Sequence, residues 1–198
     1  MDIRELNRRA VRASVETAAK ATAEDLGRPT PCDGWTLADL LAHMTAQHRG
    51  FAAAARGAGA DLEAWRVRPV GADAVAVYTE AAEDVLAAFA EEGVLDREFT
   101  LPEFTQPEFG REPVFPAAQA IGFHFIDYLV HAWDVARSLD IAFTADPELV
   151  EAAWPIALAV PDDERRNRPG AAFRPGLAVP EDAPGFDRIL ARLGRSPV

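Results

Sequence analysis

The sequence of 198 residues has one cysteine, Cys32, and one lysine, Lys20. A single cysteine cannot form a disulfide within the chain or a thiolate metal site, so we expect a protein of the reducing cytoplasm. No apolar run approaches the length of a membrane span without a charge, and the N-terminal segment has no apolar core of a signal peptide. The composition thus predicts neither secretion nor a transmembrane helix.

Basic charge is also scarce. The chain has 20 Lys and Arg against 32 Asp and Glu, which gives a formal net charge of −12. Phosphate backbones and anionic lipids repel such a chain, and no cluster of basic residues in the sequence is large enough to reverse the sign locally. We therefore expect a small-molecule partner, no nucleic acid and no membrane.

Hydrophobic residues make up 49% of the chain, which suits one globular domain with a short appendage. Apolar positions at helical spacing predict helices over residues 3–26, 36–57, 72–91, 116–139, 146–159 and 184–194. The proline-rich segment 94–116 is expected to be a structured loop or lid, and residues 176–179 a short extended run. The pattern predicts an all-α fold, a four-helix bundle in residues 1–159, with a C-terminal helical extension, residues 160–198, packed on it.

Polar side chains on apolar helix faces mark the candidate site. Asp127 and His131 are spaced i, i+4 and share one face of the predicted helix 116–139, and His124 lies on the same stripe. His43 lies in a different predicted helix, residues 36–57, on the same side as Leu40. Two imidazoles and one carboxylate on facing helices can hold a divalent metal with open coordination positions. The spacing alone favours a buried, hydrogen-bonded Asp–His pair with a core histidine over a metal site.

Two runs carry a family resemblance. TPCDGWTLADLLAHM and AIGFHFIDYLVHAWDVARSLD resemble the signature segments of the DinB-like superfamily, in the branch similar to the N-terminal domain of mycothiol-dependent maleylpyruvate isomerases. Within that branch, the chain is most similar to uncharacterised actinobacterial metal-binding proteins. The resemblance implies an antiparallel four-helix bundle that binds a divalent metal through His43, Asp127 and His131. The isomerase branch has Glu where this chain has Asp127. The shorter side chain of Asp127 would pull the metal toward the helix 116–139 or weaken its binding.

Other residues have weaker signals. Asp134 and Asp39 are each predicted either to accept a hydrogen bond from a metal-binding imidazole or to be solvated carboxylates on a helix face. His124 is either an extra ligand or a buried histidine with its hydrogen bonds satisfied. Nothing around Cys32 marks a reactive thiol. We expect His48 at the surface. Trp35 and Trp133 are expected to be core anchors in preference to platforms for a substrate.

Two functions remain open. In the first, a divalent metal, with zinc or nickel favoured, activates water or a low-molecular-weight thiol such as mycothiol for transfer to, or isomerisation of, a small electrophile. The segment 99–115 would then close one side of the pocket, where Arg111 either binds an anionic group or, as is more expected, faces solvent. In the second, the bundle binds a metal or small ligand without catalysis, as a sequestering or sensing protein, with a homodimer as one open state. No clearly placed acid or base is visible, which keeps the second hypothesis open.

Overall fold

The computed structural model describes residues 2–104, 113–168, 171, 173–180 and 182–197. Contacts divide the chain into two compact units, Met1–Phe143 and Thr144–Val198. Among the described residues, the long elements of the first unit are four helices: α1 (Ile3–Ala18), α2 (Leu37–Ala55), α3 (Ala74–Phe89) and α4 (Ala117–Ser138).

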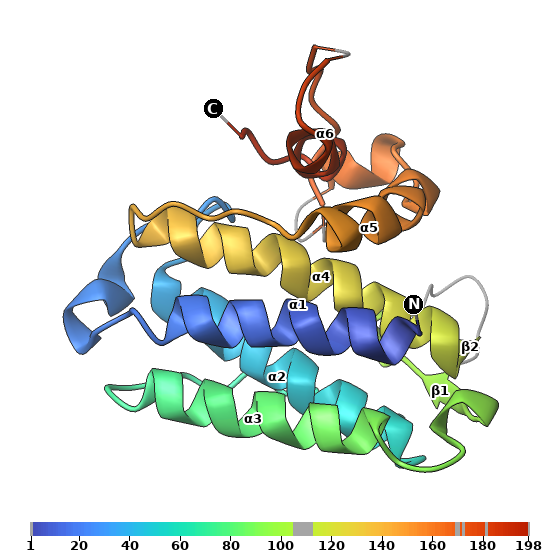
Figure 1. Ribbon diagram of the computed structural model, residues 1–198. Coiled ribbons are helices and arrows are strands. Elements are labelled where there is room, and N and C mark those ends of the chain that lie inside the picture. Colours follow the sequence, from blue (N-terminus) through green and yellow to red (C-terminus); the bar gives the residue numbers. More distant parts are fainter. Residues whose placement is uncertain (1, 105–112, 169–170, 172, 181, 198) are drawn as a thin grey trace. The chain divides into compact units, whose positions relative to one another are not determined.

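These four helices form a bundle (Figure 1). α1 packs along α4 and α2 along α3, and the two pairs also meet through α1 with α3 and α2 with α4. α1 and α4 run in one direction, and α2 and α3 run antiparallel to them. Since α2 and α3 are parallel, a tight turn cannot join them, and the long connection 56–73 carries the chain back along the bundle. The predicted all-α fold and four-helix bundle are confirmed.

Most helix ends agree with the sequence prediction within about two residues, but α1 does not. It ends at Ala18, and the expected continuation to residue 26 is wrong. Thr22 has an extended backbone and forms a capping box with Asp25, which starts the short 3-10 helix η1 (Ala23–Gly27). A capping box marks the start of a new helix. The apolar spacing continues across the gap between α1 and η1, so the spacing could not show where α1 ends.

Apolar side chains fill the interior of the bundle, and α4 contributes to it on most sides. Of its 22 residues, 17 are buried, which accounts for the nearly all-round apolar sequence. One cluster of buried side chains includes Phe51, Phe89 and Phe99, and a second includes Met44, Tyr78 and Tyr128. No helix in the described part of the chain is long and apolar enough to cross a bilayer.

Short elements connect α3 to α4: η2 (Val94–Asp96), β1 (Glu98–Thr100), η3 (Pro102–Phe104) and β2 (Val114–Pro116). β1 and β2 pair antiparallel with Phe99 opposite Phe115. The rings of Phe104, Phe115 and Phe123 lie 5.1–5.3 Å apart between centroids and fasten η3 to the start of α4. The described part of this segment has no α-helix, as its prolines predicted; Arg111 lies outside the described residues.

The second unit contains α5 (Pro147–Ala159), η5 (Glu164–Asn167) and α6 (Gly185–Arg192). α5 packs against α6, and the guanidinium of Arg188 lies 4.6 Å from the ring centroid of Trp154. The buried guanidinium of Arg166 donates hydrogen bonds to the carbonyls of Pro161 at 2.7 Å and Arg192 at 2.7 Å. A charged side chain therefore ties this small unit together through main-chain acceptors.

Residues 176–179, expected to be a short extended run, belong to no helix or strand, and the Leu177 amide donates to the Ala191 carbonyl at 2.9 Å. α5 contacts α6 and belongs to the second unit. The division into a domain of residues 1–159 and an extension of residues 160–198 stays a prediction, to be tested by truncation.

Candidate metal centre

Helices α2 and α4 bring three ligating side chains together. His43 lies on α2, and Asp127 and His131 lie one turn apart on α4. One ligand atom from each of the three lies within 4.8 Å of the other two. Asp127 Oδ1 is 3.3 Å from His131 Nε2, and the rings of His43 and His131 meet edge to face with centroids 5.5 Å apart.

Asp134 orients the ring of His131. The Nδ1–H of His131 donates to Asp134 Oδ2 at 2.8 Å, which leaves Nε2 as the nitrogen facing Asp127. Asp134 is fully buried, and the Cys32 thiol also donates to its Oδ2, with Sγ at 3.6 Å. A carboxylate behind an imidazole fixes the tautomer and the direction of the free nitrogen, as it does behind many metal-binding histidines.

The charges around His131 favour a cation. Burial by itself lowers the pKa of His131, but the Asp127 and Asp134 carboxylates outweigh it and hold this pKa well above its usual value. Burial likewise acts to raise the pKa of Asp127, and the attraction of His131 outweighs it so that the net shift is downward. A site that holds an extra proton this strongly has the negative potential that a metal cation requires.

The donor set fits a divalent metal. Two imidazoles and a carboxylate are ligands that zinc and related ions take in proteins, and three protein ligands leave a coordination position for another molecule. The Nε2 of His131 is free of Asp134, and the Asp127 side chain is 30% exposed, so small molecules can reach the centre. A second set of three donors, Cys32, His131 and Asp134, also lies within 4.8 Å, but it uses the Nδ1 that already donates to Asp134.

Over residues 7–136 the chain matches the family described as the mycothiol maleylpyruvate isomerase N-terminal domain. The chain belongs to this family. The resemblance drawn from the two sequence runs is thereby confirmed. Two uncharacterized proteins of Mycobacterium tuberculosis, from strains CDC 1551 and H37Rv, are each 32% identical to it over 196 residues, 99% of this chain and 99% of each relative.

Two solved structures share the fold of this family member. One is the crystal structure of the mycothiol-dependent maleylpyruvate isomerase, with a TM-score of 0.59 and 14% identity. The other is a histidine-to-alanine mutant of that enzyme, with a TM-score of 0.62 and 13% identity. Each alignment covers 83% of this chain and 70% of the solved chain.

Three further residues that the sequence singled out have different surroundings. Trp35 was expected in the core but is 37% exposed, and its ring lies 4.9 Å from that of His43 between centroids. It precedes the cap of α2 and is therefore held at the edge of the centre. Trp133 is buried. The exposed Asp39 accepts hydrogen bonds from Thr36 N at 2.9 Å and Thr36 Oγ1 at 2.6 Å, so its carboxylate caps α2.

A second polar cluster lies deeper in the bundle. His124 Nδ1–H donates to Asn7 Oδ1 at 2.7 Å, and His48 Nδ1–H donates to His124 Nε2 at 3.1 Å. His48 is fully buried and stacks on Tyr128 with centroids 3.9 Å apart, so the prediction that it lies at the surface is wrong. α2 is covered by both α3 and α4, which buries positions that a single apolar stripe would leave exposed.

Both histidines of this cluster are neutral near neutral pH. Burial lowers the pKa of His124 to about 3. Burial, followed by the neighbouring His124, lowers the pKa of His48 well below its usual value. The cluster is thus a hydrogen-bonded part of the core. Within the described residues the buried Nε2 of His48 and Nδ2 of Asn7 have no hydrogen-bond partner.

Glu103 on η3 is the ionisable neighbour of the centre that the sequence did not suggest. Desolvation by the surrounding protein, and then the negative charge of Asp127, raise the pKa of Glu103 to about 7, although the residue keeps an exposed surface. A hydrogen bond with Gln47 acts in the opposite direction. A single glutamate among prolines and phenylalanines has no periodicity that could have marked it.

Proposed function

We propose that this family member binds a divalent metal through His43, Asp127 and His131 and acts on a small electrophile with a low-molecular-weight thiol such as mycothiol. The observation that carries the proposal is the convergence of these three ligand atoms within 4.8 Å, from two packed helices. The family and the fold shared with the mycothiol-dependent maleylpyruvate isomerase support the thiol and the isomerisation or transfer.

The chain's own residues would prepare the site. A bound divalent metal would act as a Lewis acid and lower the pKa of a thiol or water in its open position. Asp134 keeps a proton on His131 Nδ1, so Nε2 is the nitrogen that would give up its proton and offer a lone pair to a metal. Trp35 covers the ring of His43 at the edge, where an aromatic face can exclude water from a bound ligand.

Catalysis also needs a group that moves a proton and is not a ligand. Glu103, whose pKa is about 7, can both accept and donate a proton near neutral pH, and the negative charge of Asp127 contributes to raising that pKa. We propose Glu103 for this role. Its place on η3, outside α2 and α4, lets it serve the centre without being one of the three ligands.

The first test is the metal content of dialysed, tag-free protein. Wild type should hold about one equivalent of zinc or nickel after loading, and His43→Ala, Asp127→Ala and His131→Ala should each lose it. Glu80→Ala, which removes an exposed carboxylate on α3, is the matched control and should bind as wild type does. Absence of metal from loaded wild type would refute the proposal.

The second test is thiol chemistry. Metal-loaded protein is mixed with mycothiol and maleylpyruvate, and then with mycothiol and a generic aryl halide, and product is compared with that from the free metal. Product above that background in wild type, and absent from His43→Ala, supports an enzyme. Metal binding without any such product would favour the alternative, a bundle that binds a metal or small ligand without catalysis.

A further inference from the structure

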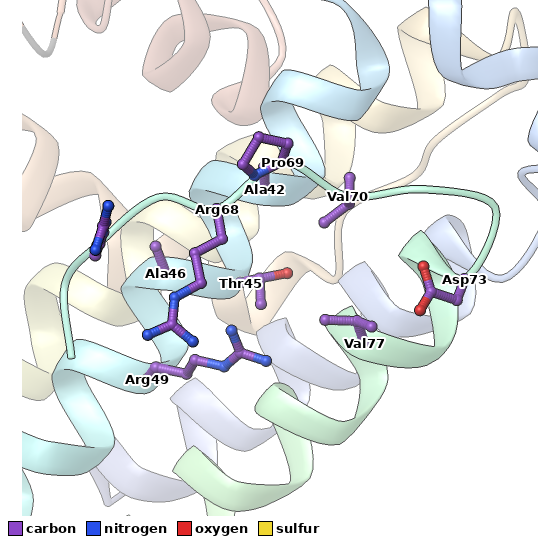
Figure 2. A pocket seen from close by; sticks show the side chains of 10 residues that line it. Ala42, Thr45, Ala46, Arg49, Arg68, Pro69, Val70, Asp73 and Val77 are labelled. Atoms are coloured by element: carbon purple, nitrogen blue, oxygen red, sulfur yellow. The ribbon is translucent and has the colours of Figure 1, made fainter. Parts of the chain in front are cut away.

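A cavity of about 190 Å³ lies on the bundle away from the candidate metal centre. Its walls come from α2, from the connection 56–73 and from the first turn of α3 (Figure 2). Thr45 and Arg49 of its lining lie roughly 160° and 120° around α2 from His43, given 3.6 residues per turn. Ala46 of the lining is nearer, at roughly 60°, so the cavity and the metal centre use neighbouring sides of α2, and His43 is not among the residues that line the cavity.

Three arginines line this cavity: Arg49 from α2, and Arg66 and Arg68 from the connection. Figure 2 shows the side chains of Arg49 and Arg68 extending from different elements toward the same part of the cavity. Like charges repel, so such an approach has an electrostatic cost unless an anion lies between them. In a chain of net charge −12 this concentration of positive charge is unusual.

The acidic partners of these arginines do not neutralise them. Arg68 is 2.6 Å and Arg66 is 3.4 Å from the carboxylate of Glu63, so one carboxylate serves two guanidinium groups. Arg49 is half-buried and forms no hydrogen bond or ion pair with any residue that the structure describes. Asp73 is the acidic residue of the lining, and Figure 2 places it across the cavity from Arg49 and Arg68.

The rest of the wall between these charges is mainly apolar. Ala46 from α2, Val70 from the connection and Val77 from α3 contribute alkyl surface, and the hydroxyl of Thr45 is already engaged with the Leu41 carbonyl at 2.7 Å. A ligand that fits would place an oxyanion against the guanidinium groups and an apolar body against the valines. Asp73 would repel a second negative charge at the far end.

We propose that this cavity binds a small organic anion, in which one carboxylate or phosphate group is held by Arg49 and Arg68 and an apolar body lies against Val70 and Val77. Guanidinium groups pair with both kinds of oxyanion through paired hydrogen bonds. A basic cavity in an acidic surface also selects against nucleic acids and acidic proteins, since the surrounding charge repels large polyanions.

The test is calorimetric titration at ionic strength fixed with sodium chloride, using phenyl phosphate, phenylacetate and inorganic phosphate. Wild type should bind at least one of the two organic anions more tightly than inorganic phosphate, and the tighter of the two identifies the headgroup. Arg49→Gln and Arg68→Gln should each raise the Kd at least about tenfold. Arg49→Lys, which keeps the charge and loses the paired geometry, should lie between wild type and Arg49→Gln.

Two control variants check that the anion binds in this cavity. Arg8→Gln removes an exposed arginine that pairs with Glu5 on α1, and it should leave the Kd unchanged. His43→Ala should also bind the anion normally, because His43 is not among the residues that line the cavity. No binding by wild type, equal binding by Arg49→Gln, or loss of binding in His43→Ala would each overturn the proposal; far-UV circular dichroism verifies that each variant is folded.

Discussion

The buried histidine cluster predicts a specific dependence of stability on pH. His124 is 1% exposed, and it is held between Asn7 on α1 and His48 on α2. The other titratable groups packed near it are Tyr128, whose ring stacks on it, and Asp127 on the same helix. In His124→Gln, an amide takes the place of the imidazole, so it can keep a donor and an acceptor but cannot gain a proton.

The magnitude follows from linkage. The folded pKa of His124 is about 3 and the unfolded one is 6.5, so the unfolded chain binds the proton more strongly. Stability from this group is complete above pH 6.5 and is lost as the pH falls from there toward 3. Between pH 7.5 and pH 5 the loss is about 2 kcal/mol, at 1.36 kcal/mol for each pKa unit.

The assay compares wild type and His124→Gln by urea unfolding, with EDTA present so that metal binding plays no part. Raised pKa values such as that of His131 act in the opposite direction, but they are common to both proteins and cancel in the difference. The stability of wild type relative to His124→Gln should fall by about 2 kcal/mol from pH 7.5 to pH 5. A difference independent of pH would show that His124 is not buried as a neutral ring.

Four other outcomes are expected. Thr36→Ala removes the hydroxyl that accepts from the Asp39 amide and donates to the Asp39 carboxylate, and it should cost about 1 kcal/mol in urea unfolding; an unchanged midpoint would contradict this. Phe99→Ala empties a fully buried site and should cost about 3–5 kcal/mol, with Phe99→Leu costing less; equal costs would contradict the packing. Asp134→Asn should weaken zinc binding about 10–100-fold, because a neutral amide accepts from His131 Nδ1–H more weakly than a carboxylate does; unchanged affinity would leave Asp134 a structural residue. Glu103→Gln should remove the ionisation near pH 7 from the pH profile of the thiol reaction while metal content stays that of wild type; an identical profile would exclude Glu103.

The sequence predicted the parts of the fold that depend on repeated local patterns. The apolar spacing of α2, α3 and α4 reports which side of each helix meets its neighbours, and it located these helices closely. The end of α1 depends instead on a single backbone turn at Thr22, where the capping box with Asp25 begins a new element. The hydrogen bonds between Thr22 and Asp25 therefore decided where the helix ends, although the apolar pattern continues past that point.

The candidate site was predictable where its residues are close in sequence. Asp127 and His131 share a helix face by their spacing alone, while the link to His43 was one open alternative that only the resemblance favoured, because α2 and α4 meet through the fold. Asn7 and His124 are 117 positions apart, and no sequence pattern in either helix predicts the hydrogen bond between them. Polar residues in apolar helices can be found from sequence, but their partners across the bundle cannot.

The arginine-lined cavity shows that clusters of charge, like hydrogen-bond partners across the bundle, cannot be found from the sequence alone. Counting residues predicted that nothing in this acidic chain would reverse the sign locally, yet Arg49 on α2 shares a cavity with Arg66 and Arg68. The cause is the parallel arrangement of α2 and α3, which forces the connection 56–73 back along the bundle and past Arg49. The local potential is therefore set by the path of a crossover segment, and net charge constrains only the average over the surface.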